Sequence, residues 1–203
     1  RYYCAHFGVR RVVLPRILTI AEIRAIRREI PCEIETFIFG NHGLMVEGRC
    51  SLTNYLTGQS TNMDGVCSPA SDVEYVRHAD GAMSSRLAGF TIDRFGPAEM
   101  AGYPTICKGR YQAPHRPEGY YAFEEPVSLN LSRLLPELID AGVHAFKIEG
   151  RQRSKSYVRQ VVSAFRKAVD DIRAGRAADM ADLVALTEGR KETQGAFETK
   201  KWR

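Results

Sequence analysis

The feature that most constrains this fold is a pair of strand–helix–strand patterns, one near each end of the chain. In the first pattern, residues 9–14 read as a buried strand that ends at Pro15, and residues 33–39 read as the next strand. Between them, Thr19 and Glu22 form a capping box that begins an amphipathic helix. Strands joined through a helix favour parallel pairing with a crossover connection.

The second pattern lies in the last third of the chain. It consists of a strand at residues 127–130, a helix at 131–140 with Gly142 as its C-cap, and a strand at 143–148. A longer helix is predicted at residues 156–174, where apolar side chains recur at intervals of three and four. The predicted fold class is therefore α/β, with a partial TIM-barrel-like parallel sheet and covering helices.

The two patterns are separated by a long insertion, residues 40–126, that carries cysteines and is rich in Gly, Pro, Ser, Thr and Asn. It contains only short strand-like pieces, such as residues 90–93 and 105–107, and so long an irregular segment is uncommon in a compact domain unless it is functional or pinned by something. A complete eight-stranded barrel needs about 250 residues. Residues 1–175 are therefore expected to form the C-terminal part of a barrel-like domain, and residues 176–203 a polar, partly mobile tail.

Composition and charge restrict the cellular compartment and the partners that we expect for this protein. The net charge is +5, spread without a block of one sign, which favours a solvated surface over a nucleic-acid stripe. No apolar run approaches the ~20 residues of a membrane helix, and no export signal begins the chain. We therefore expect a cytoplasmic protein that has no transmembrane segment and no DNA partner.

Five cysteines form an odd set, so a disulfide framework is not expected. Cys50, Cys67 and Cys107 lie in the insertion, each near residues that allow tight turns. Soft thiolates in such loops suit an iron–sulfur cluster or zinc, and buried inert thiols are the alternative. Cys4 and Cys32 are interpreted as structural thiols.

Several segments resemble, in the same order, the UbiU-type branch of the collagenase-like peptidase family. The likeness extends over residues 2–172. Glu-Gly-Arg-Cys at 47–50 and Lys-Ile-Glu-Gly-Arg-Gln-Arg-Ser at 147–154 resemble the family broadly, whereas Val-Cys-Ser-Pro at 66–69 and Cys-Lys-Gly-Arg-Tyr at 107–111 resemble this branch in particular. The resemblance implies an iron–sulfur subunit of oxygen-independent ubiquinone biosynthesis. Such a subunit hydroxylates the quinone-precursor ring as a heterodimer with a UbiV-type protein, with prephenate as the oxygen donor.

The resemblance also implies a 4Fe-4S cluster on four cysteines. Three ligand positions fall on Cys50, Cys67 and Cys107, and the fourth falls on Gly43, which has no side chain. His42 is a weak substitute, since imidazole replaces thiolate in some clusters. The cluster is therefore expected to be incompletely ligated or lost.

Four further residues are substrate-binding candidates. Glu149 and Arg151 follow the strand at 143–148, and substrates of parallel α/β folds bind beyond the carboxyl ends of strands. An ion pair is the alternative. Lys108 and Arg110 adjoin Cys107, where they could offset the charge of a thiolate-ligated cluster or simply form a solvated basic loop.

Protease chemistry is not expected, because no nucleophile–base signature or H-E-x-x-H motif is present, and the sequence assigns no catalytic residue. Two other functions remain open. One is RNA hydroxylation, known in other members of the family and compatible with a sequence pI near 9.0. The other is a cluster-free member of the family that acts as an interaction protein.

Overall fold

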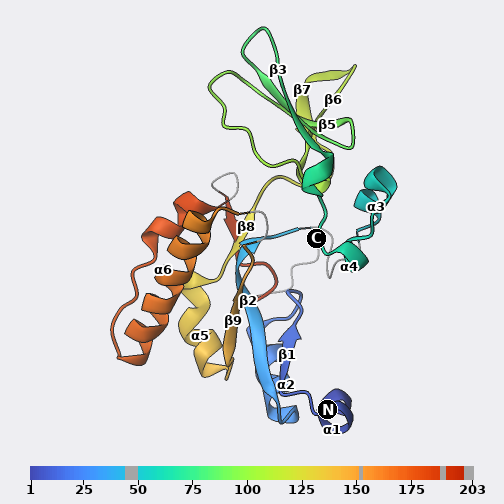
Figure 1. The fold of residues 1–203 in the computed structure, drawn as a ribbon. Helices are drawn as coiled ribbons and strands as arrows, with labels where there is room; N and C mark the ends of the chain where they lie inside the picture. The colour runs from blue at the N-terminus through green and yellow to red at the C-terminus, as the bar shows by residue number, and fades with distance from the viewer. Residues whose placement is uncertain (44–49, 151–152, 188–190, 199–203) are drawn as a thin grey trace. The chain divides into compact units, whose positions relative to one another are not determined.

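The computed structural model describes residues 1–43, 50–150, 153–187 and 191–198, which form two compact units (Figure 1). Unit 1 combines residues 1–42 with residues 127–203, and unit 2 is formed by residues 43–126. The cysteine-bearing insertion thus folds as a unit of its own.

Unit 1 is built on a mixed sheet of five strands. These are β1 (Arg11–Leu14), β2 (Glu33–Asn41), β8 (Ser128–Asn130), β9 (Ala145–Ile148) and β10 (Glu192–Thr193). The pairs β1–β2, β2–β9 and β8–β10 are parallel, whereas β2 and β8 are antiparallel. The predicted strands at both ends of the chain are therefore present.

The TIM-barrel-like arrangement is not confirmed, because the described strands form an open sheet and no closed barrel. Five strands are fewer than the eight that a TIM barrel needs. The antiparallel pairing of β2 with β8 also breaks the all-parallel pattern. It arises because the whole of unit 2 lies between these strands, so the chain returns without a crossover helix.

Two predicted helices are confirmed. Helix α2 (Ile20–Glu29) begins at the predicted capping box, in which the Glu22 amide donates to Thr19 Oγ1 at 3.2 Å and the Thr19 amide donates to Glu22 Oε2 at 2.8 Å. Helix α6 (Lys155–Arg173) begins at Ser154, whose side chain accepts a hydrogen bond from the Tyr157 amide. None of the described helices is long and apolar enough to cross a membrane.

The predicted helix at 131–140 divides into a 3₁₀ turn, η3 (Ser132–Leu134), and helix α5 (Leu135–Asp140). Pro136 explains the division, because it lacks an N–H group and is tolerated only in the first turn of an α-helix. Figure 1 shows α5 and α6 beside the sheet of unit 1. Both helices contribute buried apolar side chains to one core.

The end of the chain also enters this core. Turn η4 (Ala181–Leu186) carries Leu183, and Phe197 follows β10; each side chain is only 1% exposed. The Ile20 amide donates to the Phe197 carbonyl at 2.9 Å. The prediction of a polar tail missed these two buried side chains, because isolated apolar residues give no periodic pattern in the sequence.

Unit 2 contains two small antiparallel sheets rather than a mainly irregular segment. Strands β3 (Val73–Arg77), β4 (Met83–Leu87) and β5 (Phe90–Phe95) form one sheet, and β6 (Arg110–Ala113) and β7 (Arg116–Tyr121) form the other. Its helical elements are α3 (Ser51–Thr57), α4 (Thr61–Asp64), η1 (Ala70–Asp72) and η2 (Ile106–Lys108); a short helix α1 (Tyr2–Phe7) belongs to unit 1. The strand predicted at 105–107 is wrong, because η2 lies there.

Candidate functional site

Cys50 and Cys67 are linked through one buried threonine in unit 2. The Cys50 thiol lies 3.4 Å from Thr53 Oγ1, and Thr53 Oγ1 donates to the Cys67 carbonyl at 3.0 Å. The Cys50 amide also donates to Thr61 Oγ1 at 3.3 Å. Thr53 is completely buried in α3. It therefore holds the Cys67 backbone close to the Cys50 thiol.

Cys107 lies on η2, which packs against α3. Burial raises the pKa of the Cys107 thiol to about 11, and the negative charges of Glu124, Cys67 and Cys50 act in the same direction. Lys108 acts in the opposite direction. The three cysteines of unit 2 therefore interact electrostatically, and a metal that binds Cys107 has to displace its proton.

These residues match a soft metal centre in chemistry but not in preassembled geometry. Within the ranges that the structure describes, no group of three or more His, Cys, Asp or Glu side chains is arranged to hold a metal ion. At the fourth family position, a Cβ added to Gly43 would lie 3.5 Å from Glu124 Oε1, an ordinary contact, and the backbone φ is not positive. A cysteine would therefore fit at this position.

Lys108 is buried rather than part of a solvated loop. Its side chain is 5% exposed, and its Nζ lies 3.3 Å from Glu124 Oε1. Burial lowers the pKa of Lys108, while the Glu124 carboxylate opposes this shift. Glu124 is tied to the thiol loop as well, since its amide donates to the Cys107 carbonyl at 3.2 Å.

Arg110 connects strands of unit 2. Its guanidinium lies 3.0 Å from Asp93 Oδ1 and 3.0 Å from Glu99 Oε2, and it donates to the Arg94 carbonyl at 2.6 Å. Burial raises the pKa of Asp93, although Arg110 opposes that shift. These contacts hold β5 to β6, and they engage the guanidinium that was a substrate-binding candidate.

A second set of polar groups lies at the carboxyl ends of the parallel strands in unit 1. Glu149 follows β9 and forms an ion pair with Arg16, which follows β1. Arg16 also donates to the Asn41 carbonyl and stacks 4.1 Å from the centre of the Phe37 ring. Sequence reasoning missed Arg16, although its position shortly after a predicted strand was a usable signal. Arg151 lies outside the described residues.

Gly40 allows the ends of β2 and β9 to approach closely. Its φ is +128°, and an added Cβ would lie 2.6 Å from the Glu149 carbonyl oxygen. The adjacent Asn41 Oδ1 is buried and has no hydrogen-bond partner in the part of the chain that is described. This edge of the sheet therefore presents an ion pair and a buried amide oxygen beside each other.

His42, the weak substitute ligand, belongs to unit 1, whereas Gly43 and the three candidate cysteines belong to unit 2. Its amide donates to the Val127 carbonyl at 3.1 Å, and its ring lies 3.2 Å from where a Cβ on Gly195 would be. The described contacts of His42 are therefore those of a residue packed within unit 1.

A basic groove lies along the first turns of α6, and sequence reasoning missed it. The groove has a volume of about 450 Å³, and it is lined by Arg153, Lys155, Val158, Arg159, Val162 and Ser163. A lining that combines basic and apolar side chains suits a phosphate-bearing ligand with attached rings. The usable signal was the spacing of four between Lys155 and Arg159, which places both on one helix face.

Comparison with known proteins identifies the family. A model of peptidase family U32 matches residues 2–201. The chain is 31% identical over 163 residues to tRNA hydroxylation protein P1 of Bacillus subtilis, covering 80% of this chain and 32% of that protein. It is 31% identical over 194 residues to tRNA hydroxylation protein P of Escherichia coli, covering 88% of this chain and 43% of that protein.

A third relative is the 23S rRNA 5-hydroxycytidine C2501 synthase of Escherichia coli, with 28% identity over 190 residues, covering 94% of this chain and 23% of that protein. No solved structure matches. The chain thus spans less than half the length of these relatives. The comparisons bear out the resemblance to the collagenase-like peptidase family, and all three relatives are RNA hydroxylation proteins rather than ubiquinone-biosynthesis proteins.

Proposed function

Because this chain belongs to peptidase family U32, we propose that it is part of a hydroxylating member of the family that acts on RNA. The observation that carries this proposal is the similarity to two tRNA hydroxylation proteins and an rRNA hydroxycytidine synthase over 80%, 88% and 94% of the chain. The proposal replaces quinone hydroxylation as the leading hypothesis. Residues 1–203 contribute part of the complete protein's activity.

The basic groove on α6 supports an RNA substrate. Lys155 and Arg159 lie on one face of the helix and line the groove together with Arg153. Phosphate contacts of this kind supply most of the affinity of an RNA-binding surface and make it dependent on salt. Val158 and Val162, which also line the groove, give an unstacked base an apolar surface to lie against.

We further propose that Cys50, Cys67 and Cys107 hold an iron–sulfur cluster. Support comes from their shared electrostatic environment and from the hydrogen bonds of Thr53. Such a cluster supplies one-electron transfer or an iron atom with an open coordination position. In this chain, Thr53 positions the Cys50 and Cys67 loops, and Lys108 offsets negative charge at Cys107.

A second candidate is hydroxylation of the quinone-precursor ring together with a UbiV-type partner and prephenate. The observation that favours it is the Cys-Lys-Gly-Arg-Tyr segment at 107–111. This segment is held within unit 2 by the ion pair of the buried Lys108 with Glu124 and by the Arg110 contacts to Asp93 and Glu99. An apolar ring has no need of a basic groove, so charge reversal in α6 separates the two candidates.

The experiment compares tRNA binding by the complete protein and its Lys155→Glu/Arg159→Glu variant over a series of salt concentrations. The variant is expected to bind tRNA at least about tenfold more weakly and with a shallower salt dependence. Arg173→Glu is the control, because it reverses one positive charge on α6 outside the groove, where the test variant reverses two inside it. Absence of tRNA binding by the folded wild-type protein, together with hydroxylation of the quinone precursor in its host, would establish the second candidate instead.

A further inference from the structure

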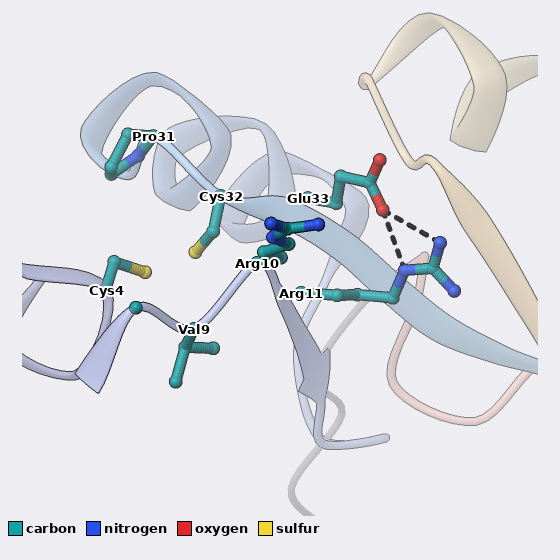
Figure 2. A pocket seen from close by; sticks show the side chains of 8 residues that line it. Cys4, Val9, Arg10, Arg11, Pro31, Cys32 and Glu33 are labelled. Carbon is teal, nitrogen blue, oxygen red and sulfur yellow. Dashed lines mark hydrogen bonds and ion pairs between the residues drawn. The ribbon is translucent and has the colours of Figure 1, made fainter.

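Two cysteines outside the proposed cluster face each other across a pocket in unit 1. Cys4 lies on α1, and Cys32 lies directly before β2. Both line a pocket of about 630 Å³, together with Pro31, Arg10 and other residues of the same segments. Figure 2 shows their sulfur atoms pointing toward one another.

The two thiols differ in accessibility. Cys32 is 6% exposed, whereas Cys4 is only partly buried, and both are free cysteines. The neighbouring Cys4 thiol, together with burial, raises the pKa of the Cys32 thiol. An accessible thiol beside a sheltered one is the arrangement in which the first reacts with a reagent and the second resolves the product.

Helix α1 is the element that a link between these thiols would restrain. It has no buried residue, and its aromatic side chains at Tyr2, Tyr3 and Phe7 are 63%, 67% and 66% exposed. An element with so little burial opens more easily than the core of the unit. A covalent bond between Cys4 and Cys32 would restrain α1, because the bond would close the chain between positions 4 and 32 into a loop.

We propose that Cys4 and Cys32 form a redox-sensitive thiol pair that closes to a disulfide and fixes α1 against the start of β2. The oxidant is a low-molecular-weight disulfide. Deprotonated Cys4 attacks one of its sulfur atoms, and the other half leaves as a thiol with the proton that Cys4 gave up. Cys32 then attacks the Cys4 sulfur of the mixed disulfide, and the second half leaves with the Cys32 proton.

In total the pair loses two electrons and two protons, and the reagent gains both. Arg10 lines the same pocket as the two thiols.

The test treats the complete, reduced protein with glutathione disulfide and maps its peptides without reduction. The expected product contains one peptide pair joined through Cys4 and Cys32, and the number of titratable thiols falls by two relative to the reduced protein. Exchange of the α1 amide hydrogens should slow by about tenfold, and dithiothreitol should restore the original rate.

Cys4→Ser and Cys32→Ser should each abolish this linked peptide pair, whereas Cys67→Ser should leave it unchanged. If a variant fails to fold, the peptide map of the oxidised wild-type protein tests the proposal without it. The proposal is overturned if the folded wild-type protein yields no Cys4–Cys32 peptide at redox equilibrium, or if it links other cysteines instead.

Discussion

Replacement of Gly40 by alanine tests the close approach on which the polar edge of unit 1 depends. The Gly40 φ of +128° is strained for any residue with a side chain, and the added Cβ would lie 2.6 Å from the Glu149 carbonyl oxygen and 2.7 Å from the Glu149 Cβ. Both contacts involve atoms close to the backbone, so neither can be relieved by rotating a flexible side chain. The ends of β2 and β9 would have to separate.

The expected loss of stability combines two effects. The unfavourable backbone conformation costs about 1–3 kcal/mol. Forcing a methyl group into a filled space costs a further ~1–3 kcal/mol. We therefore expect Gly40→Ala to lower the free energy of unfolding of unit 1 by about 2–6 kcal/mol and to weaken the Arg16–Glu149 pair.

Urea unfolding monitored by circular dichroism measures this loss, and Gly175→Ala in the same unit is the control. Gly175 has a φ of +71°, but an added Cβ would meet nothing within 4 Å, so its expected cost is only about 1–2 kcal/mol. Equal losses in the two variants would show that the approach of Glu149 to Gly40 contributes nothing, and the reasoning would fail.

Three further outcomes are expected in unit 2. Glu124→Ala leaves Lys108 buried without its carboxylate and should cost about 3 kcal/mol, much of which the additional change Lys108→Met should recover in thermal unfolding. In protein prepared without the cluster, the pKa of Cys107 is raised from 9.0 to about 11, so the stability that its protonated thiol contributes is complete below about pH 9 and is lost as pH rises through 11. Wild-type protein should therefore lose about 2–3 kcal/mol more than Cys107→Ala over that range in urea unfolding. Gly43→Cys should raise the iron-to-protein ratio after air exposure, and Cys50→Ser should lower it; equal ratios in all three proteins would refute the ligand assignment.

The confirmed parts of the fold are those with strong local signals. The Thr19–Glu22 capping box and the apolar periodicity of α6 each specify a helix through residues close together in the sequence. The strands around these helices were also found. The way these strands pair in the sheet was not predicted, because the antiparallel pairing of β2 and β8 depends on the path of the chain through unit 2.

Unit 2 was predicted poorly because its turns carry weak signals. The β4–β5 hairpin turns at Ala88 and Gly89, both at positive φ, and alanine is not a residue that indicates such a turn. At the candidate sites, Glu149 was found because it follows a strand, and the same signal was available for Arg16; the pairing of the two residues, which are distant in sequence, had no signal. Long-range ion pairs leave no periodic pattern in a single sequence.

The most direct test of the central claim is mass spectrometry of RNA nucleosides from a host that lacks its own RNA hydroxylation proteins and expresses the complete protein. We expect a hydroxylated nucleoside in tRNA or rRNA with the wild-type protein. We expect its loss with Lys155→Glu/Arg159→Glu and its retention with Arg173→Glu. Unmodified RNA in cells that contain the folded, iron-loaded wild-type protein would contradict the account.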